Sequence, residues 1–188
     1  MNALLRAAAD LQAVCVTHHW RFCFIGGIAV MRWGEPRETI DVDLTLITGF
    51  GREREFVTVL MKAFRPRIDE AAAFAERNRV LLLRADSGVG LDIALGGLPF
   101  EELAVERSTP FAYPPDIPLR TCSAEDLIVL KAFAGRPKDW VDIEGVIIRQ
   151  SHQLDWPYVQ AQLAPLVELK DAPELLEQLE RTRARLES

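Results

Sequence analysis

The stretch from Phe24 to Leu46, FIGGIAVMRWGEPRETIDVDLTL, contains residue types that can bind metal ions and phosphate. Asp41 and Asp43 are separated by one residue within an alternating segment, which predicts a β-strand over 39–47. Side chains alternate along a strand, so both carboxylates are expected on one face, where they repel each other. A hard divalent cation with oxygen ligands would relieve this repulsion. The pair therefore predicts a site for Mg²⁺ or Mn²⁺, which usually binds together with substrate phosphates.

A third carboxylate follows in the segment VGLDIAL, which predicts a strand over 89–95. Asp92 is expected on the face opposite Leu91 and Ile93, between small neighbours. If this strand pairs beside the first one, Asp41, Asp43 and Asp92 converge. Three converging carboxylates suit a two-metal, in-line phosphoryl or nucleotidyl transfer, in which a hydroxyl attacks the α-phosphate and pyrophosphate leaves.

Two adjacent glycines, Gly26 and Gly27, lie between an expected strand over 21–25 and an expected helix over 28–33. A strand, a glycine turn and a helix start bring backbone N–H groups close to an anion. Alone, the pair would indicate only a tight turn. Because two carboxylates follow at a fixed distance, phosphate binding is the favoured interpretation.

This pattern, a hydrophobic residue, two glycines, thirteen residues, DxDL and a later aspartate on a strand, resembles the nucleotidyltransferase superfamily. Within that superfamily the chain is most similar to the toxin component of abortive-infection type IV toxin–antitoxin systems, the AbiEii/AbiGii-like nucleotidyltransferases. The segment SAEDLIVLKAFAGRPKDWVDIEGVI, residues 123–147, resembles the family's lysine-bearing helix and the Arg-x-Lys-Asp helix that follows it. The resemblance extends over roughly residues 22–150.

The resemblance implies a role for each matching residue. By this resemblance, Gly26 and Gly27 bind phosphate, and Asp41, Asp43 and Asp92 bind metal and take part in catalysis. Lys131 takes part in catalysis and contacts the nucleotide phosphates. Lys138 and Asp139 form a charged pair near the nucleotide, and Asp142 follows one helical turn later. One departure concerns Ile28, because the family often has Ser or Thr at or just after the second glycine. A hydroxyl contact to phosphate is therefore missing, and the backbone must replace it. The chain is also shorter than many toxins of this class.

Several of these side chains have simpler explanations in the sequence itself. Lys131 lies in the apolar run LIVLKAFAG, where a lysine can extend its charge to the surface. Asp139 lies in the first turn of an expected helix, where an acid is favourable in any case. Arg37, just before the first carboxylate strand, is the arginine best placed to meet phosphates. Arg32 and Arg136 are weaker candidates, and surface charge is the alternative for all three.

The elements expected around these residues predict an α+β fold: a nucleotidyltransferase-like small mixed β-sheet flanked by helices, followed by a C-terminal helical bundle. Strands at 80–84 and 89–95 are joined by Asp86-Ser87-Gly88, a hairpin signal. Ile40, Val42, Leu44 and Leu46 are expected in the core. Further helices are expected over 3–18, 52–64, 99–106 and, after caps at Ser123, Asp155 and Asp171, through the C-terminal part. The expected domains are residues 1–108, the nucleotidyltransferase core; 109–122, a proline-rich linker with short strands; and 123–188, the C-terminal helical region.

Composition limits the classes of function. The 188 residues carry a formal net charge of −6, which argues against a broad electrostatic surface for nucleic acid or an anionic membrane. Three scattered cysteines are expected to be buried thiols in a reducing compartment. Neither they nor the three histidines show the spacing of a zinc site. With no membrane-length apolar run, the protein is expected to be soluble, cytoplasmic and without a membrane partner.

The leading hypothesis is a metal-dependent nucleotidyltransferase that moves NMP from an NTP to an acceptor hydroxyl. The resemblance implies a toxin that acts on tRNA or another nucleic acid and has a small antitoxin protein as partner. A small-molecule adenylyltransferase of the antibiotic-modifying kind is the first alternative, which the acidic net charge favours. A catalytically silent nucleotide-binding module on the same fold is the second, and the intact set of three carboxylates argues against it.

Overall fold

The computed structural model describes residues 2–187, which form two compact units. Unit 1 contains the residues up to Ile28 together with Glu38–Cys122. Unit 2 contains Ala29–Arg37 together with the residues from Ser123 onward. The units divide the chain differently from the three expected ranges, because the proline-rich segment belongs to unit 1 and a short early segment belongs to unit 2.

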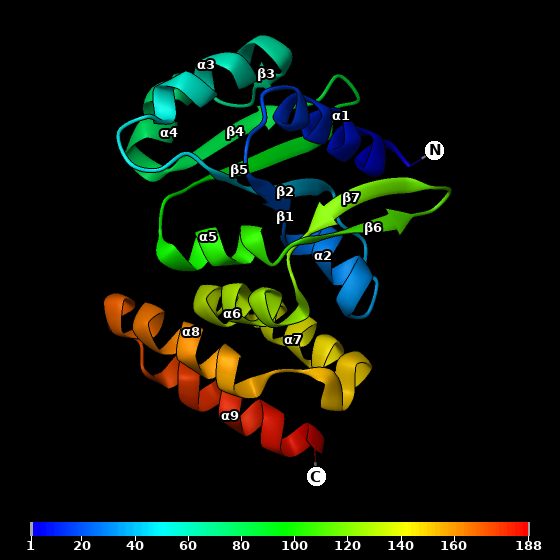
Figure 1. Cartoon of the computed structure of the whole chain (residues 1–188), viewed down its shortest axis with the longest axis vertical. Coiled ribbons are helices and arrows are strands. Elements are labelled where there is room, and N and C mark those ends of the chain that lie inside the picture. The colour runs from blue at the N-terminus through cyan, green and yellow to red at the C-terminus, as the bar shows by residue number, and fades with distance from the viewer. Residues whose placement is uncertain (1, 188) are drawn as a thin grey trace. The chain divides into compact units, whose positions relative to one another are not determined.

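Unit 1 is built on a mixed β-sheet, labelled in Figure 1, in which the described residues form seven strands in the order β3-β4-β5-β2-β1-β7-β6. The strands are β1 (Phe22–Phe24), β2 (Asp41–Ile47), β3 (Arg65–Pro66), β4 (Val80–Arg84), β5 (Gly90–Gly96), β6 (Thr109–Tyr113) and β7 (Ile117–Thr121). β2 and β5 are parallel, whereas β1–β2, β3–β4, β4–β5 and β6–β7 are antiparallel. The expected mixed sheet, the hairpin between β4 and β5 and the pairing of the two carboxylate strands are thus confirmed.

Alternation along β2 positions the carboxylates. Val42, Leu44 and Leu46 are completely buried, and the opposite face of the strand carries the two aspartates. Ile40, by contrast, is 77% exposed, so its expected place in the core is wrong. The strand begins only at Asp41, and the residue before it is not held in the alternating register.

The helices of unit 1 cover both faces of the sheet. They are α1 (Ala3–Thr17), the start of α2 (Gly26–Trp33), α3 (Glu53–Ala63), α4 (Ala71–Asn78) and α5 (Pro99–Glu106). α1 contacts β2 and β7, α5 contacts β1 and β2, and the two helices lie on opposite sides of the sheet (Figure 1). Asn2 caps α1 by accepting a hydrogen bond from the backbone N–H of Leu4 at 3.0 Å. The sequence patterns did not predict α4 or the two-residue strand β3.

Unit 2 is helical. After Ser123 it contains α6 (Ala124–Ala134), α7 (Pro137–Gln150), the 3₁₀ turn η1 (Ser151–Gln153), α8 (Trp156–Lys170) and α9 (Glu174–Glu187). The hydroxyl of Ser123 caps α6 and the carboxylate of Asp155 caps α8, as expected. Asp171 was expected to cap the last helix, but it ends α8 in a left-handed conformation with φ of 55°. A short acidic residue tolerates this conformation, which explains why it suits either helix end.

The three cysteines are buried and none of them forms a disulfide. Burial raises the pKa of the Cys15 thiol to about 12, so this sulfur is unreactive at neutral pH. None of the helices between residues 2 and 187 is both long and apolar enough to span a membrane.

Candidate active site

The three predicted carboxylates lie on one face of two neighbouring parallel strands of unit 1. Asp43 on β2 is in register with Asp92 on β5, and Asp41 is in register with Gly90. Residues in register share a face of the sheet, and residues two apart on a strand do as well, so all three carboxylates are on the same side. Each of them is half-buried. The pairing of β2 with β5 therefore brings Asp41, Asp43 and Asp92 together.

The glycine turn packs directly against one of these carboxylates. Gly26 has φ of 53°, and a Cβ atom on it would lie 2.0 Å from Oδ2 of Asp43. The backbone N–H of Ile25 also donates to the carbonyl of Asp43 at 3.0 Å, which fixes the turn to β2. A side chain at position 26 would be strained and would displace the carboxylate. The two sequence signals are therefore parts of one structure, with the first residues of α2 beside Asp43.

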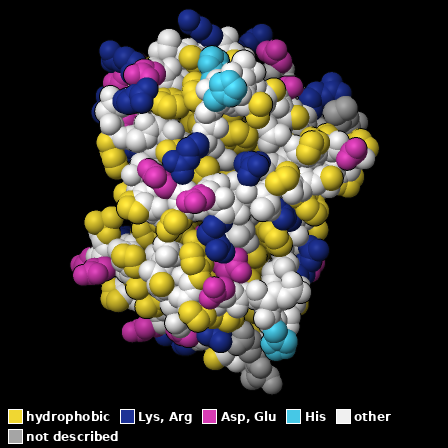
Figure 2. Space-filling view, in the orientation of Figure 1, with side chains coloured by type: hydrophobic (Ala, Val, Ile, Leu, Met, Phe, Trp, Pro, Cys, Tyr) yellow, Lys and Arg dark blue, Asp and Glu magenta, His cyan; other side chains and the backbone are white. Residues whose placement is uncertain are grey.

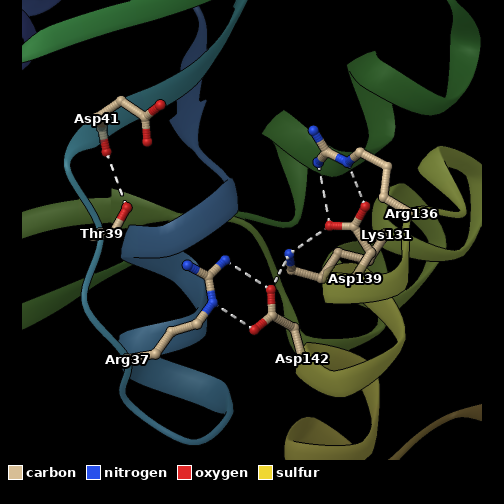
Figure 3. A network of polar contacts seen from close by, with 7 residues as sticks. All are labelled: Arg37, Thr39, Asp41, Lys131, Arg136, Asp139 and Asp142. Carbon is tan, nitrogen blue, oxygen red and sulfur yellow. Dashed lines mark hydrogen bonds and ion pairs between the residues drawn. The ribbon is translucent and has the colours of Figure 1, made fainter.

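Thr39 is a residue of this site that sequence reasoning missed. Its side chain fills the space beside the second glycine, since a Cβ on Gly27 would lie 2.3 Å from the hydroxyl oxygen of Thr39. The same hydroxyl donates to the backbone carbonyl of Asp41 at 3.3 Å (Figure 3). A hydroxyl is therefore present at the glycine turn although Ile28 supplies none. It comes from the segment that leads into β2, which no local pattern around the glycines could indicate.

Arg67 is the second residue that the sequence did not reveal. It follows β3, and its guanidinium donates to Oδ1 of Asp92 at 2.6 Å. Burial raises the pKa of Asp92, the charge of Arg67 lowers it and the charge of Asp41 raises it again, and the pKa remains above its usual range. The charge of Asp41 contributes to this direction because the two aspartates lie on one face of neighbouring strands.

The donor set fits a hard divalent cation. Between residues 2 and 187, no three His, Cys, Asp or Glu side chains are grouped closely enough to hold an ion by themselves. Carboxylate oxygens are nevertheless the preferred protein ligands of Mg²⁺, which usually binds through one or two of them together with water and substrate phosphates. Asp41, Asp43 and Asp92 supply such oxygens beside the glycine turn. The residues present therefore fit an ion that is completed by a nucleotide.

Seven other candidate residues lie in unit 2. Five of them form one network of ion pairs, shown in Figure 3: Arg37, Lys131, Arg136, Asp139 and Asp142. Lys131 on α6 donates to Asp139 Oδ1 at 3.1 Å and to Asp142 Oδ2 at 2.6 Å. Arg37 binds Asp142 with two hydrogen bonds of 2.7 and 2.9 Å. Arg136 binds Asp139 in the same two-pronged way, at 2.6 and 3.2 Å. These contacts tie α6, α7 and the early segment of unit 2 together.

Burial distinguishes the members of this network. Asp139 and Asp142 are buried, and Lys131 is only 5% exposed, so it does not extend its charge to the surface. Burial raises the pKa of each aspartate, but the hydrogen bonds from its basic partners outweigh this effect and hold the pKa below its usual range. The side chain of Arg37 is 38% exposed.

Lys138 and Arg32 are the other predicted basic residues of unit 2. Lys138 is exposed beside Asp139, and Arg32 is half-buried. Arg32 stacks over the ring of Trp33 at 3.9 Å. On the face drawn in Figure 2, Lys and Arg side chains are interspersed with Asp and Glu.

Comparisons with known proteins show the family and the fold of the chain. A protein-family model described as nucleotidyl transferase AbiEii toxin, type IV TA system, matches residues 9–185. No curated protein sequence matches the chain. The crystal structure of an antigenic nucleotidyltransferase-like protein from Paracoccidioides brasiliensis is similar with a TM-score of 0.53 and 19% identity, over 94% of this chain and 91% of that one. The solution structure of the antibiotic-resistance factor ANT(2″)-Ia has a TM-score of 0.56 and 17% identity, over 93% and 96%.

Proposed function

Because this chain belongs to the AbiEii nucleotidyl transferase family, we propose that it moves NMP from an NTP to an acceptor hydroxyl at the carboxylate face of β2 and β5. Family membership makes the chain a nucleotidyltransferase; the position of the reaction, its metal dependence and its acceptor are proposals. The observation that carries the position and the metal dependence is the register of Asp43 with Asp92 on parallel strands, with Asp41 on the same face.

The proposed roles follow from the chemistry of each group. Asp41, Asp43 and Asp92 would hold Mg²⁺ or Mn²⁺, which when bound neutralises charge on the transferring phosphate and activates the attacking hydroxyl. The backbone N–H groups at Gly26 and Gly27, at the positive end of α2, would orient the phosphates. Without these carboxylate ligands the cation would not bind, and the negative charge of the phosphates would lack the cation that offsets it.

For the nucleotide contacts of unit 2 we propose Arg37, Lys131, Lys138 and Asp139, the residues that match the family's helices. Arg37 and Lys138 have solvent-accessible surface with which they would reach a phosphate. Lys131 and Asp139 are buried together, so they would contribute mainly by holding the basic groups around them in place.

For the acceptor we propose tRNA or another nucleic acid, with a small antitoxin protein as partner. The support is the family description, which names a toxin of a type IV toxin–antitoxin system. A small winged-helix antitoxin encoded in the neighbouring reading frame would support this role further. The three buried thiols suit a reducing compartment, so we place the reaction in the cytoplasm.

Adenylylation of a small antibiotic-like acceptor is the second candidate. The net charge of −6 favours it, because a phosphate backbone binds most readily to basic surfaces. The likeness to the antibiotic-resistance factor concerns the fold alone and does not decide between the two acceptors. A catalytically silent module would have no need for three carboxylates on one face.

The test is transfer of labelled NTPs to a tRNA pool and to aminoglycosides, with and without Mg²⁺ or Mn²⁺. Asp41→Asn and Asp43→Asn should each lower the rate by about a thousandfold or more, because each variant loses a metal ligand. Their melting temperature without metal should be unchanged or higher, since one of three like charges is removed. Asp86→Asn is the matched control, because Asp86 is a 94% exposed aspartate of the same unit. Wild-type rates in either site variant would remove that residue from the metal site.

A further inference from the structure

Arg67 occupies a place that nothing in the reaction proposed above explains. It is the residue after β3, a two-residue strand at the edge of the sheet, and its backbone N–H donates to the carbonyl of Leu82 at 3.0 Å. Leu82 is in register with Asp92, and Asp92 with Asp43. The side chain of Arg67 therefore reaches across β4 to the carboxylate of Asp92, a span of two strand spacings or about 10 Å.

The guanidinium of Arg67 packs against β5 at Gly90. A Cβ on Gly90 would lie 2.5 Å from Nη1 of Arg67 and 3.5 Å from Cβ of Asp41. Glycine at this position thus leaves open the space that the guanidinium fills, next to Asp41 in the register. Arg67 and Asp92 are 25% and 29% exposed, so their ion pair is partly shielded from water. One positive charge is therefore built into the carboxylate face, paired with Asp92 and close to Asp41.

We propose that Arg67 is an internal counter-ion that competes with the divalent cation for the carboxylate face and so restricts metal binding to the NTP-bound protein. The inference rests on the proposed function, because it concerns the same carboxylates. Without metal, the guanidinium relieves the repulsion among Asp41, Asp43 and Asp92. A cation that arrives alone must overcome the repulsion from Arg67. A cation that arrives with an NTP brings phosphate oxygens, and their negative charge offsets the guanidinium.

The decisive measurement is binding of Mn²⁺ to the whole protein by electron paramagnetic resonance, with and without a non-hydrolysable NTP analogue. Arg67→Gln should bind Mn²⁺ alone about tenfold more tightly than wild type, the effect of a unit charge about 6 Å from a divalent ion at high dielectric. The gain in affinity that the analogue provides should shrink accordingly. Without metal, the melting temperature should fall by about 2–4 °C, and saturating Mn²⁺ should restore it.

Three further variants make the result specific. Arg65→Gln removes an equal charge two residues away, from an exposed pair with Asp86, and should leave Mn²⁺ affinity unchanged. Arg67→Lys should restore the weak Mn²⁺ affinity of the wild type. Gly90→Ala keeps the positive charge but displaces the guanidinium of Arg67, so this variant should bind Mn²⁺ several-fold more tightly than wild type. If Arg67→Gln does not fold, Gly90→Ala alone tests the proposal.

The proposal would be overturned if both Arg67→Gln and Gly90→Ala bound Mn²⁺ as tightly as wild type or more weakly. If Arg67→Gln instead had a lower melting temperature and an unchanged Mn²⁺ affinity, the Arg67–Asp92 ion pair would be structural only. If wild type binds Mn²⁺ with the analogue while these variants change nothing, only the role of Arg67 fails. If no variant binds Mn²⁺ under any condition, the metal-dependent function fails with it.

Discussion

Gly26 ties the position of the Asp43 carboxylate, for which we propose a catalytic role, to the conformation of a turn. Two separate features require glycine here: φ is 53°, and an added Cβ would collide with the side chain of Asp43. Many turns have a positive φ. The collision arises only because β2 passes directly beside the start of α2. A change at this position should therefore impair activity more than it impairs the fold.

We predict that Gly26→Ala lowers nucleotidyl transfer by about a hundredfold or more, because displacing a reacting group by about 1 Å can have an effect of this size. The left-handed conformation should destabilise the variant by about 1–2 kcal/mol. Gly49→Ala is the matched control, since Gly49 has φ of 69° and no atom within 4 Å of the added Cβ. Transfer rates and urea unfolding of both variants would be measured. Similar losses of activity in the two would show that backbone strain alone is responsible.

Among the individual residues of the site, the sequence predicted those recognisable from local spacing. It missed those that are brought to the site by contacts between segments far apart in the sequence. Asp41 and Asp43 are recognisable because the period of a strand fixes their common face. Thr39 and Arg67 depend on where the glycine turn packs and on the register of β3 with β4, which no single segment encodes. For Lys131 the simpler alternative to a nucleotide contact, a charge extended to the surface, is wrong, because carboxylates eight and eleven residues away hold it in the interior.

Among the elements, α6 and α7 are joined by buried charge as well as by apolar packing. Lys131 contacts both Asp139 and Asp142, and each of these also binds an arginine. Removing Lys131 would take one positive charge away from the two buried carboxylates of Asp139 and Asp142. Such a loss commonly destabilises a protein by several kcal/mol, even where the intact ion pair adds little.

We predict that Lys131→Met lowers the free energy of unfolding of the protein by about 3 kcal/mol, since it leaves buried charge unpaired. Lys138→Met, at an exposed neighbouring position, should change it by less than about 0.5 kcal/mol. Chemical denaturation would measure both, and NTP affinity would be determined on the folded fraction. Unchanged stability with weakened NTP binding in Lys131→Met would instead make this lysine a direct nucleotide contact.

The elements themselves were predicted where periodicity or capping is strong. α1, α5 and α7, the hairpin between β4 and β5 and the caps at Ser123 and Asp155 all follow from local signals. α4 was missed because the run from Ala71 to Asn78 shows only alanines and one phenylalanine on its apolar side. The proline-rich segment forms β6 and β7, and Pro110 is tolerated because β6 is an edge strand.

For the whole molecule, Asp92 of unit 1 should respond to pH in the direction opposite to that of Asp139 and Asp142 of unit 2. The pKa values of Asp139 and Asp142 are lowered, so their contribution to stability is present above about pH 4 and is lost as the pH falls through the folded-state pKa. The pKa of Asp92 is raised, so its contribution is greatest at low pH and is lost as the pH rises through the folded-state pKa.

We predict that wild type and Asp92→Asn, both without metal, lose melting temperature in parallel below about pH 4, because both retain the carboxylates of unit 2. Above that pH, Asp92→Asn should become more stable relative to wild type as the pH rises. Calorimetry between pH 3 and 7 would measure the difference. A constant difference across this range would mean that Asp92 has the same pKa in the folded and unfolded chain.

The division of unit 2 into two stretches of sequence has a consequence for synthesis on the ribosome. The segment Ala29–Arg37 is translated early, but its partners in α7 are translated about a hundred residues later: Gln150 donates to the carbonyl of Trp33, and Arg37 binds Asp142 across 105 positions. Loop closure over such a distance is slow relative to local folding, although its additional entropy is modest. The nascent chain must therefore wait for these contacts until α7 has been translated. An enzyme of this design cannot complete unit 2, and with it the nucleotide contacts proposed there, from the early segment alone.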